Sequence, residues 1–159
     1  MEVYTDGTCL YNGQPEASAG IGVFWGDGHY LNVSAVVRGD KHTNQVAEIQ
    51  AAIAAIRIAN RERFYDLIIY TDSKYVFNAA TDWIDNKWKL QGWRNSQGEI
   101  LANKKDFKKL DKIRNKYERS FGEIEWIHVH CDGGIYGNME ADRLAKQAAQ
   151  RRLDAILYY

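Results

Sequence analysis

Hydrophobic and polar positions change their spacing several times along the chain, and each change marks the border of an element. Strands are predicted where apolar residues alternate with polar ones, or form short runs between turn residues. By this criterion the strands lie at residues 3–5, 21–25, 30–37, 67–71 and 125–130. The turn residues 26–28 separate the second strand from the third, so we expect the first three strands to form an antiparallel meander.

Apolar residues recur at helical spacing in the remaining segments. Val46, Ile49 and Ile53 lie 3 and 4 residues apart and form one apolar stripe. Thr43 precedes this stripe and can cap the first turn with its side-chain oxygen, so a helix is predicted over residues 43–60. Further helices are predicted at residues 73–80, 82–87, 104–118 and 138–153.

The order of these elements predicts the fold class. Three strands, a helix, a fourth strand, more helices, a fifth strand and a final helix are typical of an α/β protein. Because the fourth strand follows a helix, it is expected to return parallel to the first, which gives a mixed sheet of five strands. The single proline and the absence of low-complexity sequence indicate no linker, so we expect one domain over residues 1–159.

The formal net charge is zero, with 21 Lys and Arg residues against 21 Asp and Glu residues. This balance argues against a nucleic-acid ligand, because proteins that bind nucleic acids are usually basic. The distribution along the chain favours such a ligand, since residues 81–120, which we call the basic segment, contain 11 basic and 6 acidic side chains. Charge alone leaves open whether this segment is a solvated surface or binds a polyanion.

Membrane insertion and secretion leave recognisable signals in a sequence. The longest apolar run is residues 51–56, far shorter than the about 20 residues of a membrane span, so no membrane partner is expected. Met1 is followed by Glu2 rather than by the basic stretch and apolar core of a secretory signal, so no such signal is expected. Cys9 and Cys131 match neither a zinc spacing nor a disulfide framework, so we expect free thiols in a reducing, intracellular compartment.

Four acidic residues stand out by their positions. Asp6 and Asp72 each follow directly on a predicted strand, and these two strands are expected to be neighbours, so their carboxylates are expected side by side. Glu48 lies beside the apolar stripe of the first helix, and Asp142 lies early in the last helix. Taken singly, each acid has an ordinary interpretation as a turn residue, a helix cap, a stripe-edge residue or a partner of a helix N-terminus.

Four carboxylates that converge would form a site for hard cations. Mg²⁺ and Mn²⁺ prefer oxygen ligands, and such an ion would offset the repulsion between neighbouring carboxylates. A pair of these ions, about 3.5–4 Å apart, supports in-line displacement at phosphorus. The acidic residues therefore suggest metal-dependent chemistry on a phosphodiester.

Several short motifs in this chain resemble type 1 ribonuclease H, and the similarity is greatest to the catalytic domain of the eukaryotic enzymes. The motifs occur in the family's order and extend from Val3 to about Ala149. The resemblance implies a ribonuclease H-like fold, with a five-stranded mixed sheet and helices on both of its faces. The matching segments are residues 3–7, 20–23, 43–48, 70–73, 126–129 and 137–142.

The resemblance also implies an activity. It is endonucleolytic hydrolysis of the RNA strand of an RNA–DNA hybrid, giving a 5′-phosphate and a 3′-hydroxyl with little sequence preference. By position, Asp6, Glu48, Asp72 and Asp142 correspond to the carboxylates that hold two Mg²⁺ ions, and Mn²⁺ can substitute. Asp6 would bridge both ions. The implied partner is the hybrid itself, and the implied oligomeric state is a monomer.

Further positions match the family's contacts with the hybrid. The basic segment resembles the basic protrusion of cellular type 1 enzymes, although one more residue separates Trp83 from Trp88 than the family pattern has. Trp93 is expected only to pack this protrusion. Ribose hydroxyls of the RNA strand would be contacted by Asn12, Asn44 and Gln45. The DNA strand would be contacted by Lys41, Thr43, Trp83, Trp88, Ser96 and Asn103.

The chain departs from the family pattern in the glycine-rich loop before the last helix. Many members have a histidine there that is associated with proton handling and product release, and this chain has Asp132 instead. An aspartate can attract or guide a metal ion, so we expect an auxiliary role for Asp132. The rival hypothesis assigns the histidine's role to His130, two residues earlier.

Other functions fit parts of the sequence. A hybrid-binding module without catalytic activity is disfavoured because all four carboxylates are present. A ribonuclease H domain from a retroelement polyprotein is disfavoured by the basic segment. A structurally related exonuclease or integrase is disfavoured by Asn44 and Gln45, which match hybrid contacts.

Overall fold

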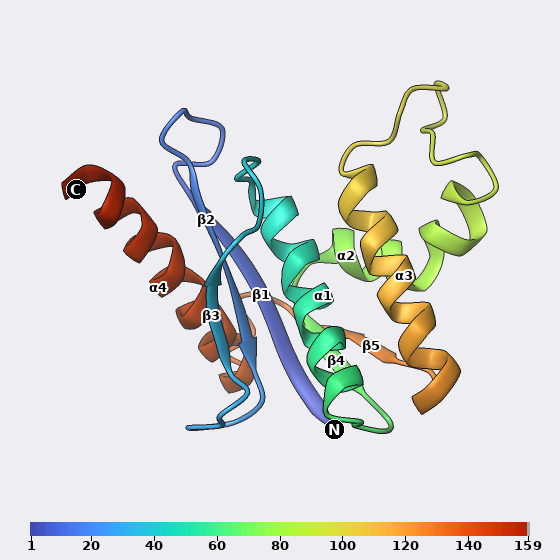
Figure 1. Ribbon diagram of the computed structural model, residues 1–159, viewed down its shortest axis with the longest axis horizontal. Coiled ribbons are helices and arrows are strands. Elements are labelled where there is room, and N and C mark those ends of the chain that lie inside the picture. The colour runs from blue at the N-terminus through green and yellow to red at the C-terminus, as the bar shows by residue number, and fades with distance from the viewer. Residues whose placement is uncertain (159) are drawn as a thin grey trace.

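The computed structural model describes residues 1–158, which form one sheet covered by helices (Figure 1). The strands are β1 (Glu2–Leu10), β2 (Ser18–Phe24), β3 (Val33–Val36), β4 (Ile68–Thr71) and β5 (Glu125–His128). The helices are α1 (Asn44–Arg61), α2 (Lys74–Asn78), the π-helix η1 (Ala79–Trp88), α3 (Lys104–Phe121) and α4 (Tyr136–Tyr158). Among these described residues, no helix combines the length and the apolar composition that crossing a membrane requires.

The sheet has the strand order β3-β2-β1-β4-β5. Strands β1, β2 and β3 pair antiparallel, whereas β4 pairs parallel with both β1 and β5, so the predicted meander and mixed sheet are confirmed. Helix α4 covers one face of the sheet, and α1 covers the other face with α2 and α3 beyond it (Figure 1). The main core lies between the sheet and α1, whose apolar stripe is fully buried.

The prediction that the first strand stops at Asp6 is wrong. Strand β1 continues to Leu10, and its second half pairs with β2, so Asp6 lies in the middle of a strand opposite Gly22. The sequence Asp6-Gly7 is typical of a turn, because glycine is usually unfavourable within strands. Here Gly7 is required by a close helix crossing, which is described with the site below.

Other boundaries also differ from prediction. Strand β3 begins at Val33 rather than residue 30, because Asn32 closes the preceding turn: its side chain accepts from Trp25 N and donates to the Gly26 carbonyl. The two short helices predicted at residues 73–80 and 82–87 form one continuous helical stretch that changes from α to π geometry at Ala79. A π turn holds more residues than an α turn, so this geometry accommodates the extra residue between the two tryptophans.

Candidate active site

The helices on both faces of the sheet cross β1 and β2 at glycines. A Cβ atom on Gly7 would lie 2.3 Å from the Ala47 carbonyl carbon, so α1 can pack this closely against β1 only where the strand has a glycine. On the opposite face, a Cβ atom on Gly22 would lie 1.9 Å from the Ala141 carbonyl oxygen of α4. Each crossing places an acidic residue next to the strand, because Glu48 follows Ala47 and Asp142 follows Ala141.

Asp6 lies between these two crossings. Side chains alternate along a strand, so Asp6 and its pairing partner Gly22 face α4, while Gly7 faces α1. The residue is only 7% exposed, and its carboxylate accepts a hydrogen bond from the Gly7 amide at 2.9 Å. Burial, the nearby charge of Asp72 and a hydrogen bond shared with Asp142 raise the pKa of Asp6 to about 9. Three of the predicted carboxylates therefore converge.

The other carboxylates are each held by a polar neighbour. The Ser73 hydroxyl donates to Glu48 Oε2 at 2.9 Å and also caps the first turn of α2. Burial raises the pKa of Glu48, and the charge of Asp72 raises it further, while the hydrogen bond from Ser73 opposes this shift.

Asp72 and Asp142 line one open pocket together with Cys131, Met139 and Lys146. The Asn138 side-chain amide donates to Asp72 Oδ2 at 3.2 Å, and Lys146 Nζ lies 2.8 Å from Asp142 Oδ2. The Asn138 side-chain oxygen is buried and has no hydrogen-bond partner. A polar atom of this kind, next to two carboxylates, marks a place that suits a further polar ligand.

The donor set fits a hard divalent cation, because it consists of carboxylate oxygens with excess negative charge in a buried position. Within residues 1–158, however, no three His, Cys, Asp or Glu side chains are already oriented so that they could hold one ion together. Glu48 is turned toward Ser73, and Asp142 toward Lys146. Joint coordination therefore requires these side chains to rotate away from their present partners.

A polar pocket at the N-terminal end of α1 gathers several residues predicted to contact DNA. Asn103 accepts from Lys41 Nζ at 2.6 Å, and its amide lies 3.2 Å from the Tyr75 hydroxyl and 3.3 Å from Gln45 Oε1. Its backbone has φ +59°, in the left-handed region that asparagine tolerates better than most residues. Asn103 thus does not cap α3 with its side chain, and instead bridges α1 and α2. Thr43 caps α1 through its hydroxyl, as predicted.

The residues predicted to contact RNA join the loop after β1 to the start of α1. Asn12 Oδ1 accepts from the Asn44 amide at 3.1 Å, and Asn44 Oδ1 accepts from the Cys9 amide at 2.7 Å. Asn12, Asn44 and Gln45 are all exposed. The structure therefore brings these three residues to the surface at the same end of α1 that carries Glu48.

The prediction that Trp88 lines the DNA channel is not supported by its burial. Trp88 is 7% exposed and packs against Phe107 with a ring separation of 4.8 Å, so it belongs to the core. Trp83 is half-buried and packs against Trp88 with a ring separation of 5.6 Å, whereas Ser96 is exposed in the loop beyond η1. Trp93 packs against Trp88, as expected. The π geometry of η1 explains the change, because it alters which side chains of this helix face inward.

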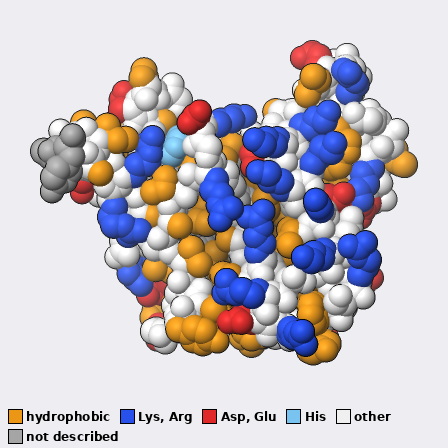
Figure 2. Space-filling view, in the orientation of Figure 1, with side chains coloured by type: hydrophobic (Ala, Val, Ile, Leu, Met, Phe, Trp, Pro, Cys, Tyr) orange, Lys and Arg blue, Asp and Glu red, His pale blue; other side chains and the backbone are white. Residues whose placement is uncertain are grey.

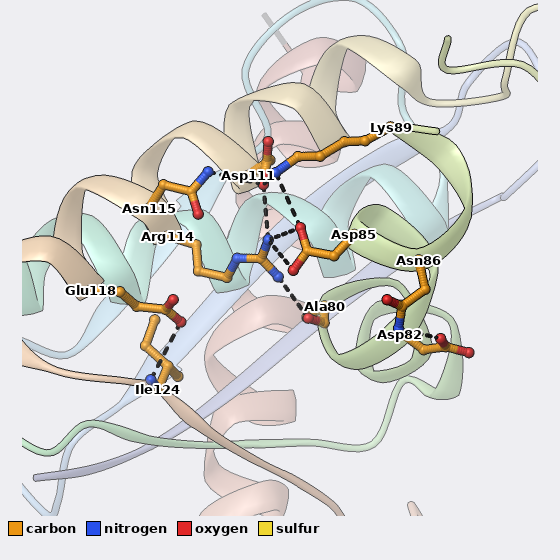
Figure 3. Close-up of polar contacts among 10 residues, drawn as sticks. All are labelled: Ala80, Asp82, Asp85, Asn86, Lys89, Asp111, Arg114, Asn115, Glu118 and Ile124. Carbon is orange, nitrogen blue, oxygen red and sulfur yellow. Dashed lines mark hydrogen bonds and ion pairs between the residues drawn. The ribbon is translucent and has the colours of Figure 1, made fainter. Parts of the chain in front are cut away.

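Lys and Arg side chains gather over the face formed by α1 and α3 (Figure 2). Two basic residues of the basic segment are nevertheless neutralised internally (Figure 3). Arg114 is 4% exposed and bonds to Asp85, Asp111 and the Ala80 carbonyl, which ties α3 to η1. Lys89 bonds to the same two aspartates at 3.1 and 2.9 Å. These residues stabilise the segment and are not free for a polyanion.

Asp132 and His130 both lie on the exposed loop between β5 and α4. Asp132 does not line the pocket that contains Asp72 and Asp142, although its neighbour Cys131 does. His130 packs edge-on against His128 with a ring separation of 5.5 Å, and His128 Nε2 lies 3.3 Å from the Asp72 carbonyl oxygen. Both Cys131 and the buried Cys9 are free thiols, as expected.

Four supporting residues were missed by reasoning from sequence. Ser73 and Asn138 lie within the matching segments 70–73 and 137–142, but nothing in their positions indicates which carboxylate each contacts. Lys146 was detectable, because a lysine four residues after Asp142 lies on the same side of a helix. Tyr75, which contacts Asn103, carries no signal in the sequence because the two residues lie on separate elements.

Comparison with known proteins gives a consistent result. The RNase H family model matches residues 1–150. Ribonuclease H1 of Mus musculus is 45% identical over 96% of this chain, and Ribonuclease H of Cyanothece sp. (strain PCC 7425 / ATCC 29141) is 32% identical over 95% of this chain and 90% of its own length. The structure of LC11-RNase H1 in complex with RNA/DNA hybrid superposes with a TM-score of 0.64 at 22% identity, covering 96% and 98% of the two chains.

The relatives differ in length. This chain spans about half of the mouse protein, 51% of its residues. The similarity to the LC11 structure lies below 25% identity and supports the fold alone. It agrees with the predicted ribonuclease H-like fold, which is confirmed.

Proposed function

The chain belongs to the ribonuclease H family, and on this basis we propose that it hydrolyses the RNA strand of RNA–DNA hybrids. The proposed products carry a 5′-phosphate and a 3′-hydroxyl, and sequence preference is weak. One observation carries the proposal beyond family membership: Asp6, Asp72 and Asp142 converge at a buried position that opens into a pocket. A surplus of carboxylates around the buried Asp6 suits a reaction that places divalent cations next to a phosphate.

The proposed cofactors are two Mg²⁺ ions, for which Mn²⁺ can substitute. When bound in such a site, these ions lower the pKa of the attacking water and stabilise the leaving oxygen. Asp6 is the proposed bridging residue, because it is the most deeply buried of the four carboxylates and the Gly7 amide fixes one of its oxygens. Glu48, Asp72 and Asp142 are the proposed outer ligands.

Ser73 and Asn138 are proposed to position these ligands rather than to react. Ser73 is held as the cap of α2, so its hydrogen bond fixes Glu48 relative to the end of β4. Asn138 is 3% exposed and holds one oxygen of Asp72, which leaves the other oxygen free. Asn138 would thereby orient Asp72 before substrate arrives, a form of preorganisation that favours catalysis, whereas Glu48 would leave Ser73 when it joins the ions.

We further propose how the hybrid is recognised. Asn12, Asn44 and Gln45 are exposed beside the carboxylates and can contact 2′-hydroxyls, the groups that distinguish RNA from DNA. Neither their backbone contacts nor their position suggests readout of base sequence.

The DNA strand is proposed to bind at the first turn of α1, on the side away from the residues proposed to contact RNA. Lys41 and Asn103 line a polar pocket suited to one phosphate, and Thr43 at the start of α1 is a further proposed contact. Trp83 and Ser96 would extend this surface along η1 and the following loop. Trp88 supports Trp83 from the core and is not proposed as a direct contact.

A cleavage assay tests this function. The protein is incubated with an end-labelled RNA–DNA hybrid, double-stranded RNA or double-stranded DNA, each with Mg²⁺ and with chelator. The proposal predicts cleavage of the RNA strand of the hybrid alone, and only with Mg²⁺. Tight hybrid binding without cleavage at any Mg²⁺ or Mn²⁺ concentration would identify a binding module instead. Equal cleavage of double-stranded RNA would contradict the proposed role of the DNA-strand contacts.

A further inference from the structure

An apolar groove lies on the solvent side of α1, between β3 and α3, away from the carboxylates. Its floor is formed by Val33 and Ala35 of β3 and by Ile53, Ala54 and Ile58 of α1, and its volume is about 290 Å³. We call this hollow the β3–α1 groove. In Figure 2 a strip of hydrophobic side chains is visible on this face, with Lys and Arg side chains beside it. An apolar strip with a charged border is typical of a protein-binding surface.

The border of the groove is strongly basic. Arg38, Arg57, Arg61 and Lys109 line it, and Asp106 is the one acidic residue among its lining residues. Within residues 1–158, the side chains of these four basic residues form no hydrogen bond or ion pair with the protein. They differ in this respect from Lys89 and Arg114, whose charges are satisfied internally. The free cations therefore favour an acidic partner.

The lining chemistry discriminates between acidic partners. Single-stranded nucleic acids are usually held by aromatic side chains on which the bases stack, and the groove is lined by aliphatic residues without an aromatic ring. A polypeptide with aliphatic side chains suits this floor better. An added β-strand is disfavoured, because Arg151 already donates to the outward carbonyl of Ser34 on the edge strand β3.

We propose that the β3–α1 groove binds an acidic amphipathic helix of a partner protein. The helix would place its aliphatic side chains on the floor around Ala54 and its carboxylates against Arg38, Arg57, Arg61 and Lys109, in the helix-in-groove mode. This surface is separate from the carboxylates, since Ile58 lies ten residues after Glu48 on α1, about 15 Å along the helix axis. Arg38 and Lys109 also line the pocket proposed for the DNA phosphate, so the partner helix and the DNA strand would meet at these two residues.

The test uses designed peptides. The main probe is a labelled, helix-forming peptide of about 18 residues, with leucines at helical spacing on one side and glutamates on the other. One control peptide carries lysines in place of the glutamates, and a second has the same composition with the leucines scattered. Binding is measured by fluorescence anisotropy, and its location by amide shifts in nuclear magnetic resonance. We expect saturable binding of the acidic amphipathic peptide alone, with shifts at Val33, Ala35 and Ala54.

Matched variants locate the binding further. Arg57→Glu reverses a charge on the groove border and is expected to weaken peptide binding about 10-fold, because one close charge pair is replaced by a repulsion. Arg119→Glu makes the same change at an exposed position outside the groove lining and is expected to have less than about a 2-fold effect. Arg57→Glu is also expected to leave hybrid hydrolysis unchanged, so this test is independent of the proposed function.

Three results would overturn the proposal. One is the absence of saturable binding by the acidic amphipathic peptide. Another is equal binding of the scattered or lysine peptide, or equal weakening by Arg57→Glu and Arg119→Glu, since either would reveal only non-specific attraction. The third is displacement of the peptide by a single-stranded DNA oligonucleotide with shifts in the same residues, which would assign the groove to nucleic acid.

Discussion

Two clusters of charged side chains, one beside β1 and β4 and one between η1 and α3, are built on opposite principles. The carboxylate cluster, consisting of Asp6, Glu48, Asp72 and Asp142, combines four acids with one partly exposed lysine, Lys146. Burial and the neighbouring charge of Asp72 raise the pKa of Asp6 and of Glu48, so the negative charge of the cluster is only partly satisfied. Such an arrangement destabilises the protein unless a cation is added.

The second cluster is balanced. In the Arg114 cluster, two basic residues, Arg114 and Lys89, meet two acidic residues, Asp85 and Asp111 (Figure 3). Burial alone would raise the pKa of Asp85, but hydrogen bonds and charges from Lys89 and Arg114 hold it below its ordinary value. The comparison teaches that a buried charge cluster indicates function when its charges do not cancel, and structure when they do.

The largest expected effect is on catalysis. Asp6→Asn or Asp72→Asn removes a negative charge from the carboxylate cluster and keeps the shape of the side chain. Hydrolysis is expected to fall at least about 1000-fold, because ion binding and transition-state stabilisation both depend on these charges. Hybrid binding, measured by anisotropy, should persist, since the residues proposed to contact RNA and DNA remain. Near-normal turnover in Asp72→Asn would remove Asp72 from the proposed site.

The next effect concerns folding stability. Arg114→Met leaves Asp111, which is largely buried, and the Ala80 carbonyl without their main donor, so the free energy of unfolding is expected to fall by about 3 kcal/mol. Arg119→Met on the same helix removes an exposed charge and should cost less than about 0.5 kcal/mol. Urea unfolding monitored by circular dichroism measures both. Equal, small losses would show that the Arg114 cluster adds little to stability.

The pH dependence of stability should separate the two clusters. Without divalent ions, the folded protein holds a proton on Asp6 that the unfolded chain releases near its ordinary pKa, so the free energy of unfolding should fall as the pH rises from 4 to 9. The contribution of Asp85 to the free energy of unfolding changes with pH in the opposite direction. Its lowered pKa stabilises the fold at neutral pH, and this contribution is lost in acid. Comparing Asp6→Asn with the wild type by urea unfolding at pH 5 and pH 8 isolates the Asp6 contribution. If the free energy of unfolding of the wild type changes between pH 5 and pH 8 in the same way as that of Asp6→Asn, the predicted contribution of Asp6 is contradicted.

The smallest effect is expected at the loop before α4. Asp132→Ala should lower activity several-fold and raise the Mg²⁺ concentration needed for full activity, because an exposed acid near the pocket attracts cations only through solvent. His130→Ala tests the rival assignment, which predicts that loss of His130, rather than of Asp132, is the damaging change and alters the pH dependence of activity. Activity measured across Mg²⁺ concentration and pH distinguishes them. Wild-type behaviour of Asp132→Ala at every Mg²⁺ concentration would exclude a role for Asp132.

The sequence predicted the antiparallel meander, the mixed sheet with its first and fourth strands as neighbours, and the proximity of Asp6 to Asp72, because these depend on periodicity and on short motifs. It did not predict that β1 continues through Gly7, since the need for glycine comes from a helix that approaches from elsewhere in the chain. The burial of Trp88 was also unpredictable, because it depends on π geometry within η1. The Arg114 cluster was hidden for the same reason: its members lie on two elements whose contact the sequence does not encode locally.

The central claim is that the carboxylate cluster is completed by divalent cations. It is tested most directly by calorimetric titration of Mg²⁺ into the wild type and Asp6→Asn at pH 7.5, in two buffers with different ionisation enthalpies. Because Asp6 has a pKa of about 9 without ions, Mg²⁺ binding should release about one proton from the wild type and none at this site from Asp6→Asn. Mg²⁺ binding that releases no proton, or that is unchanged in Asp6→Asn, would contradict the account.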